Sequence, residues 1–310
     1  MARIAGTDFD VFQICLGGNV FGWTADEKQS FAVLDAYAEA GGNFVDTADV
    51  YSVWAPGHAG GESETVLGRW MAARKNRGRM VVATKVGSFP GLDGLAAGTI
   101  RAAADASLRR LQIDRIDLYY AHRDDPKTPL EETLRAFDEL VRAGKVGAIA
   151  ASNFSAARLA EALALSRRER LARYVALQPH YNLVERAGYE RELAGLCARE
   201  GLACFPYYAL AKGFLTGKYR PGAGVQSARA EGAKKYLDAR GLRILAALDG
   251  VATAHQTTVA AVALAWLLAQ PTVVAPIASA RTPEQLAELL PAATLRLTRE
   301  EVERLSEASG

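Results

Sequence analysis

The feature that most constrains the fold of this 310-residue chain is a regular alternation of two kinds of segment. Short apolar runs of strand type alternate with longer segments, rich in Ala, Leu, Arg and Glu, that have a helical period. The runs that predict strands are 11–16, 43–46, 80–85, 116–121, 146–151, 173–177, 202–207 and 273–277. The segments that predict helices are 26–40, 62–77, 99–111, 130–142, 155–166, 189–200, 257–269 and 283–290.

Eight strands that are each followed by a helix predict a parallel sheet, because parallel neighbours need a crossover connection. The α/β sheet can then be an open, doubly wound sheet or a closed (β/α)8 TIM barrel. We favour the barrel, as a single domain over residues 1–310, because the alternation continues throughout without a long linker or a break in composition.

One segment interrupts this rhythm. Residues 213–233 are rich in glycine and basic, and an extra helix is predicted at about 237–255. Together they form an insertion at about 213–256, and two interpretations of it stay open. It is either a lid over the mouth of the barrel or an ordinary surface loop.

Charge and composition exclude several classes of protein. Lys plus Arg (37) nearly equals Asp plus Glu (35), so the net charge of +2 gives no general reason to expect nucleic-acid or membrane partners. The longest apolar stretch, 258–269, is too short to span a membrane. The first residues lack the apolar core of a secretory signal, and Cys15, Cys197 and Cys204 form no C-x-x-C motif. We therefore expect a cytoplasmic protein with reduced cysteines.

Reactive side chains follow consecutive predicted strands. Asp46 ends the second strand, with Tyr51 five residues later, Lys85 ends the third and His122 the fourth. In barrel enzymes the carboxyl ends of the strands carry the chemistry, so these four side chains are expected to meet at one face. Each taken alone also has a plain structural explanation, such as a helix cap, a packed loop aromatic or a solvated strand end.

An Asp–Lys–Tyr relay beside an imidazole suits proton transfer to a developing alkoxide. Free tyrosine has a pKa near ~10, and a neighbouring ammonium lowers it by favouring the phenolate. A carboxylate keeps that ammonium charged in a desolvated cleft, and a neutral imidazole can orient a substrate oxygen. No protein side chain donates hydride, so a nicotinamide or a flavin is required.

The usual phosphate-binding and metal-binding motifs are missing from the sequence. There is no G-x-G-x-x-G, the segment GFLTGKY fails the P-loop spacing, and no metal-ligand pattern occurs. A better anion site follows the eighth strand, where Ser279 and Arg281 precede a helix that starts near Pro283. A simple surface helix cap is the alternative there.

Seven segments together resemble the aldo-keto reductase superfamily, in particular bacterial reductases akin to potassium-channel β subunits. They are DTADVY, ATK, DLYYAHRDD, ASNFS, LQPHYNL, PYYALAKGFLTGKY and PIASARTPEQL, in that order along nearly the whole chain. The resemblance implies a (β/α)8 barrel that binds NADPH over its mouth and reversibly reduces an aldehyde or ketone.

The resemblance also implies roles for individual residues. Tyr51 would be the general acid, Lys85 and Asp46 would tune its pKa, and His122 would orient the carbonyl. For the cofactor, Ser152, Asn153 and Gln178 would hold the carboxamide, and Tyr207 would stack on the nicotinamide. Leu210 and Lys212 would line the pyrophosphate groove, with Lys218 and Arg229 reaching over from the insertion. The residues implied at the 2′-phosphate, ribose and adenine end are Ser279, Arg281, Gln285 and Glu288.

Aromatic residues on the loops after the strands are candidates for substrate contact. They are Phe21, Trp23, Trp54 and Phe89, and they suit an apolar small-molecule carbonyl substrate, although ordinary loop packing explains each of them equally well. A homo-oligomer is compatible with the sequence.

Two other functions stay open. A barrel aldolase would use Lys85 as a Schiff-base nucleophile, and an accessory or sensor subunit would bind the nicotinamide with little turnover.

Overall fold

Eight parallel strands form the central sheet of the computed structural model, which describes residues 1–222 and 230–310. The expected cofactor residue Arg229 lies outside the described residues. From one edge to the other, the sheet runs β11 (Ala203–Cys204), β10 (Tyr174–Gln178), β9 (Val146–Ser152), β8 (Ile116–Ala121), β5 (Val81–Val86), β4 (Phe44–Asp46), β3 (Cys15–Gly17) and β12 (Ile277–Ala278).

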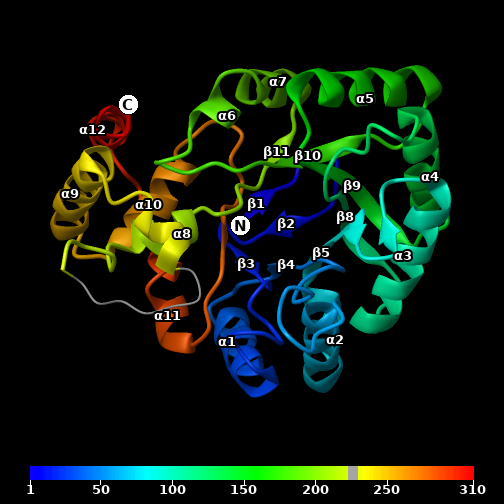
Figure 1. Ribbon diagram of the computed structural model, residues 1–310, viewed down its shortest axis with the longest axis horizontal. Helices are drawn as coiled ribbons and strands as arrows, with labels where there is room; N and C mark the ends of the chain where they lie inside the picture. Colours follow the sequence, from blue (N-terminus) through cyan, green and yellow to red (C-terminus); the bar gives the residue numbers. More distant parts are fainter. Residues whose placement is uncertain (223–229) are drawn as a thin grey trace.

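The sheet curls, and helices lie around its outer side (Figure 1). Backbone contacts link the chain near its two edge strands. Cys204 forms a parallel bridge with Val273 and donates from its backbone N–H to the carbonyl of Thr272 at 2.8 Å. Farther along, the N–H of Ile277 donates to the carbonyl of Pro206 at 2.9 Å. The expected α/β class with eight parallel strands is confirmed.

Most of the helices fall where the sequence predicts them. They are α1 (Glu27–Glu39), α2 (Glu62–Arg74), α3 (Ala97–Leu111), α4 (Leu130–Arg142), α5 (Ala156–Glu169), α6 (Ala187–Glu190), α7 (Leu193–Glu200), α9 (Ala239–Ala254), α10 (Val259–Leu268) and α11 (Pro283–Ala287). Side-chain caps explain several starts. Asp26 accepts from the backbone of Gln29 in a capping box, whereas Ser155 and Thr258 cap α5 and α10 by accepting from a backbone N–H without one.

The sheet is buried on both faces, as parallel sheets are. All residues of β8 are buried, and alternate side chains enter two different apolar clusters. Leu118 and Tyr120 pack inside the curl with Phe44 and Phe205, whereas Tyr119 packs outward with residues of the helices. The strands therefore present side chains to an inner core and to a helix-covered outer core.

The first predicted strand, 11–16, is not one element. Instead, β1 (Ala2–Arg3) and β2 (Asp10–Val11) form an antiparallel hairpin, and the chain enters the sheet only at β3. Val11 packs with the residues inside the curl, so the hairpin covers part of that inner core. The apolar run thus serves two elements, because its residues are buried in both.

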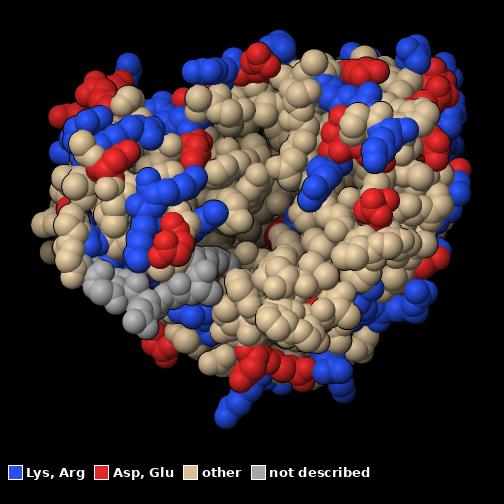
Figure 2. Space-filling view, in the orientation of Figure 1, with Lys and Arg blue, Asp and Glu red and all other residues tan. Residues whose placement is uncertain are grey.

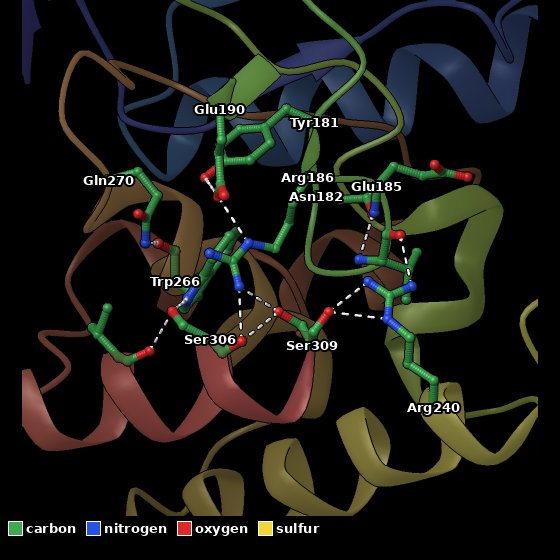
Figure 3. A network of polar contacts seen from close by, with 12 residues as sticks. Tyr181, Asn182, Glu185, Arg186, Glu190, Arg240, Trp266, Gln270, Ser306 and Ser309 are labelled. Atoms are coloured by element: carbon green, nitrogen blue, oxygen red, sulfur yellow. Dashed lines mark hydrogen bonds and ion pairs between the residues drawn. The ribbon is translucent and has the colours of Figure 1, made fainter. Parts of the chain in front are cut away.

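The C-terminal helix α12 (Arg299–Ala308) is not among the predicted elements. Two arginines hold its end (Figure 3). Arg186 donates to the carbonyl of Ser306 and to the hydroxyl of Ser309, both at 2.7 Å, and Arg240 donates twice to the carbonyl of Ser309. These contacts attach the end of the chain to the segment that follows β10, through Arg186, and to α9, through Arg240.

The insertion contains a 3-10 segment, η2 (Ala211–Thr216), and a short helix, α8 (Ala230–Lys234), before α9. No single helix within 1–222 or 230–310 is long and apolar enough to cross a membrane, although α9 and α10, bent by 96°, meet the length and composition test as a pair. In the same residues, no group of three or more His, Cys, Asp or Glu side chains could hold a metal ion.

Candidate active site

Asp46, Lys85 and Tyr51 meet at the carboxyl ends of β4 and β5. The Nζ of Lys85 donates to Asp46 Oδ2 at 2.7 Å and to Tyr51 Oη at 3.0 Å. The Oη of Tyr51 lies 3.4 Å from the same carboxylate oxygen. The ammonium group is therefore held between a carboxylate and a phenol.

This ion pair is fully enclosed by the protein. The Lys85 side chain is 0% exposed and that of Asp46 is 3% exposed, so solvent screens their attraction little. Lys85 also donates to the carbonyl of Thr47 at 2.7 Å, and Gln178 donates to Asp46 Oδ1 at 2.9 Å. Burial alone would lower the pKa of Lys85, but Asp46 and Tyr51 together raise it above its ordinary value. The lysine is thus an ammonium at neutral pH.

The environment keeps Tyr51 protonated. Burial raises the pKa of Tyr51 above its usual range, and the opposing effect of Lys85 is smaller. The direction expected from the sequence, a lowered phenol pKa, is therefore not the one found in the structure. The reason is that desolvation disfavours the phenolate by more free energy than the attraction of the neighbouring ammonium favours it. A protonated phenol is the form that can donate a proton.

His122 lies beside this group at the end of β8. Its ring centroid is 6.3 Å from that of Tyr51, and the two planes meet at 74°. Burial, followed by the charges of Lys85 and Arg123, lowers the pKa of His122 to about 3. Its Nδ1 is buried and has no hydrogen-bond partner among the described residues. The ring is a neutral imidazole.

Ser152, Asn153 and Tyr207 form a second chain of contacts. The Nδ2 of Asn153 donates to the carbonyl of His122 at 2.9 Å and to Ser152 Oγ at 3.1 Å. The Oη of Tyr207 donates to Asn153 Oδ1 at 2.8 Å, and Ser152 Oγ donates to the carbonyl of Gln178. Asn153 has a φ of 56°, a left-handed conformation that asparagine tolerates well. These residues connect the ends of β8, β9, β10 and the segment after β11.

The residues expected to bind the phosphates and the adenosine lie on two segments. The first segment runs from β12 (Ile277–Ala278) through α11. Ser279 donates to Asn19 Oδ1 at 2.7 Å, and Gln285 accepts from the backbone of Arg281 at 3.0 Å. Gly17 approaches Ser279 so closely that a Cβ atom there would lie 2.5 Å from its hydroxyl. Thr282 caps α11, while Glu288 is exposed at its end.

The second of these segments is η2 and its flanks, at the start of the insertion. Leu210 and Lys218 lie on either side of η2, and Lys212 lies within it. Lys212 has its ammonium 5.4 Å from the centre of the Tyr208 ring, and that of Lys218 lies 5.2 Å from the Tyr219 ring. No carboxylate within 1–222 or 230–310 forms an ion pair with Lys212 or Lys218, and the same holds for Arg281.

The four aromatic candidates for substrate contact are placed differently. Trp54 is 46% exposed, and its ring meets those of Tyr51 at 6.0 Å and Trp23 at 5.5 Å. Phe89 packs under the Arg110 guanidinium and against Gly60. Phe21 is fully buried, so its ring presents no surface to a ligand in this structure. Trp54 is thus the candidate that lies against the tyrosine, and Trp23 packs against Trp54.

The residues present fit a nicotinamide dinucleotide. Figure 2 shows a hollow over the middle of the curled sheet, walled mainly by residues that are neither basic nor acidic. His122 Nδ1 is a buried polar atom that lacks a partner, and Lys212, Lys218 and Arg281 supply cations without paired carboxylates in the described part of the chain. Neutral walls, an imidazole nitrogen without a partner and cations without paired carboxylates match a nicotinamide, a carbonyl and phosphates in their chemistry.

Sequence reasoning missed three contacts of this site. The Thr47 carbonyl accepts from Lys85, Asn19 accepts from Ser279, and the ring of His180 stacks on Tyr207. Every residue has a backbone carbonyl, so the residue type does not indicate which carbonyl accepts a hydrogen bond. The position of His180, two residues after the end of β10, was the one available signal.

Comparison with known proteins places this chain in a family. The family model described as "Aldo/keto reductase family" matches residues 13–309. The chain therefore belongs to the aldo/keto reductase family, whose fold is a (β/α)8 barrel and whose members generally use nicotinamide cofactors.

Individual relatives agree with this assignment. The chain is 36% identical to an uncharacterized oxidoreductase, YrpG, of Bacillus subtilis, over 97% of this chain and 93% of the relative. It is 32% identical to norsolorinic acid reductase B of Aspergillus parasiticus, over 96% and 81% of the two chains. It is 33% identical to a probable voltage-gated potassium channel subunit beta of rice (Oryza sativa), over 90% and 86%. The resemblance identified from the sequence is confirmed, and carbonyl reduction is the chemistry that the family supports.

Proposed function

We propose that this protein is an NADPH-dependent reductase of aldehydes and ketones in which Tyr51 is the general acid, and that its curled sheet is the closed (β/α)8 barrel of the family. The observation that carries the proposal is the placement of Lys85 Nζ, 3.0 Å from Tyr51 Oη and 2.7 Å from Asp46. The phenol is protonated and can donate, and the hydrogen bond from the buried ammonium favours the phenolate that forms when the proton leaves.

When bound, the reduced nicotinamide supplies the hydride that the carbonyl carbon gains. Tyr51 gives its proton to the carbonyl oxygen, so the net change is addition of one hydride and one proton across the C=O bond. The ammonium of Lys85 stabilises the phenolate left behind, because its hydrogen bond to the oxygen strengthens as negative charge develops. Asp46 and the Thr47 carbonyl keep that ammonium in place.

His122 has a different task. Because its pKa lies far below neutrality, it stays uncharged and can hydrogen-bond to the substrate oxygen without competing as an acid. Its ring lies at a steep angle to that of Tyr51, so two groups can converge on one oxygen from different directions. This arrangement orients the carbonyl rather than protonating it.

For the cofactor, we assign the nicotinamide carboxamide to Ser152, Asn153 and Gln178 and the ring to Tyr207. We assign the pyrophosphate to the segment around Leu210, Lys212 and Lys218, and the 2′-phosphate and adenosine to Ser279, Arg281, Gln285 and Glu288. Ser152, Asn153 and Tyr207 already contact one another next to His122, which supports placing the reactive end of the cofactor there.

The aldolase alternative fits the site poorly. A Schiff-base lysine must be an unprotonated amine during attack, and enzymes obtain one by lowering the pKa of the lysine. Here the pKa of Lys85 is raised, and its ammonium is already engaged by three oxygens. The accessory-subunit alternative differs from the reductase only in turnover.

The substrate proposed is a small apolar carbonyl compound, with Trp23 and Trp54 beside the reacting group. The three cysteines are free and buried, which supports a reducing, cytoplasmic compartment, and neither nucleic acid nor membrane is proposed as a partner. A homo-oligomer stays a prediction from the sequence.

The deciding experiment is NADPH oxidation, followed at 340 nm with a panel of aromatic and aliphatic aldehydes and ketones, with NADH assayed in parallel. Steady turnover of several carbonyls with NADPH supports the reductase. Tight NADPH binding without turnover of any of them would favour the sensor subunit, and borohydride trapping of substrate on Lys85 would favour the aldolase.

A further inference from the structure

His180 has no role in the reaction described above, yet it makes a specific contact with a residue of the proposed cofactor site. It directly follows β10 and Pro179, and its ring stacks on that of Tyr207 with centroids 5.3 Å apart and planes 16° apart. Most aromatic pairs in this structure meet edge to face, so a nearly parallel pair is distinctive. The contact covers one side of the Tyr207 ring.

The backbone sets these two residues side by side. His180 and Tyr207 form a parallel β-bridge, and the N–H of Tyr207 donates to the carbonyl of Pro179 at 2.9 Å. At the other end of the side chain, Tyr207 Oη donates to Asn153 Oδ1 at 2.8 Å. Tyr207 is thus held at its backbone, along one face of its ring and at its hydroxyl oxygen, and the residue remains partly exposed.

The imidazole itself is also held. The Tyr208 ring meets it edge-on, with centroids 5.5 Å apart and planes at 73°. Asn182 donates to the carbonyl of Tyr208 at 2.9 Å and so supports that neighbour. The Nε2 of His180 is buried and has no hydrogen-bond partner within 1–222 or 230–310. Its ring therefore contributes by stacking, and burial lowers the pKa of His180, which keeps the ring neutral.

We propose that His180 is a positioning residue for the nicotinamide: it stacks behind Tyr207 and, together with Asn153, holds that ring in place before the dinucleotide binds. The inference rests on the proposed function, because it takes the open face of Tyr207 as the surface on which the nicotinamide stacks. A ring that is ordered in advance does not lose its rotamer freedom on binding, and this favours association.

The test compares two ligands in the absence of carbonyl substrate. NADP⁺ contains the nicotinamide, whereas adenosine 2′,5′-bisphosphate keeps the adenosine and the 2′-phosphate but lacks it. Their affinities are measured by titrating intrinsic fluorescence in the wild type and in His180→Ala, His180→Phe and the remote control His255→Ala. We expect His180→Ala to weaken NADP⁺ by about three- to tenfold and to leave the bisphosphate unchanged. His180→Phe, which keeps a stacking ring, should retain most of the affinity.

A double-mutant cycle with Tyr207→Leu separates positioning from a general structural effect. If His180 acts through Tyr207, then removing the histidine in the Tyr207→Leu background changes NADP⁺ affinity no further. Near-UV circular dichroism of the unliganded proteins should show a smaller tyrosine signal in His180→Ala than in His180→Phe.

Three results would overturn the inference: unchanged NADP⁺ affinity in His180→Ala, equal weakening of both ligands, or additive effects in the cycle. Wild-type protein that binds no NADP⁺ at all would instead contradict the proposed function.

Discussion

Gln178 Nε2 donates a 2.9 Å hydrogen bond to Asp46 Oδ1, joining two buried side chains that lie 132 positions apart in the chain. Between their strands, β10 and β4, the sheet order places β9, β8 and β5. Side chains of such distant strands can touch only because the sheet curls and both point inward. The Asp46 carboxylate is therefore held by its own strand, by Lys85 of the neighbouring strand and by the Gln178 amide from across the interior.

Replacing Tyr51 by Phe removes the proposed proton donor and little volume. We expect kcat for carbonyl reduction to fall by about 10²- to 10⁴-fold, the range usual for loss of a general acid, while NADPH binds as before. NADPH oxidation gives the rate, and fluorescence titration gives the affinity. Tyr174→Phe is the matched control. It also removes a tyrosine hydroxyl, but that hydroxyl is buried and has no hydrogen-bond partner in the described residues. Near-normal turnover of Tyr51→Phe would reject this tyrosine as the acid.

Arg281→Ala tests the 2′-phosphate assignment. If its guanidinium contacts that phosphate, the change weakens NADPH by about 10-fold or more and affects NADH little, because NADH lacks the group. Titration of both cofactors measures the difference. Arg299→Ala serves as the control, because Arg299 lies on α12 and pairs with Glu303. Equal weakening of the two cofactors would remove the assignment.

The pKa of His122 predicts the shape of the pH profile. Burial and the charges of Lys85 and Arg123 lower it to about 3, so the imidazole does not gain a proton between pH 5 and 8. We expect kcat/KM of the wild type to show no ionisation near the ordinary histidine value of ~6.5 in that window. Measuring kcat/KM as a function of pH at constant ionic strength tests this expectation. A break near pH 6.5 that His122→Gln abolishes would mean that the histidine titrates during catalysis.

The sequence predicted the order and kind of most elements because both cores impose strong patterns on it. The helix α4 has the predicted bounds, since its apolar face and its flanking residues agree. The strand at 11–16 was predicted wrongly because burial in a hairpin and burial in a parallel sheet demand the same apolar residues. The helix α12 was missed even though Thr298 and Glu301 carry a capping box.

The site was predictable to the level of residue type and strand order. Asp46, Lys85, Tyr51 and His122 do lie together, because parallel strands end at the same edge of a sheet. The sign of the Tyr51 pKa shift was not predictable, since it depends on how deeply the fold buries the phenol. Likewise, the stack of His180 on Tyr207 requires a register between β10 and the next segment that no local pattern encodes.

Asp49 is a buried carboxyl group that the proposed mechanism does not use. It is 1% exposed, and neither carboxylate oxygen has a hydrogen-bond partner among the residues described. Burial, followed by the charge of Glu64, raises the pKa of Asp49 to about 7. Glu64 accepts hydrogen bonds from Thr84 and Arg110, and its charge opposes ionisation of Asp49.

This raised pKa makes stability depend on pH. An aspartate in the unfolded chain loses its proton near pH ~3.9, whereas Asp49 in the folded protein keeps it until about pH 7. Between those values the folded state binds more protons than the unfolded state, so its contribution to stability falls as pH rises and is lost above the folded pKa. Across this pH range, the shifted pKa of Asp49 lowers the free energy of unfolding by at most about 4 kcal/mol. Asp49→Asn should therefore raise the melting temperature relative to wild type at pH 8 and lose that advantage at pH 4. Thermal unfolding at both values, with the exposed Asp114→Asn as control, measures it, and a pH-independent difference would contradict the assignment.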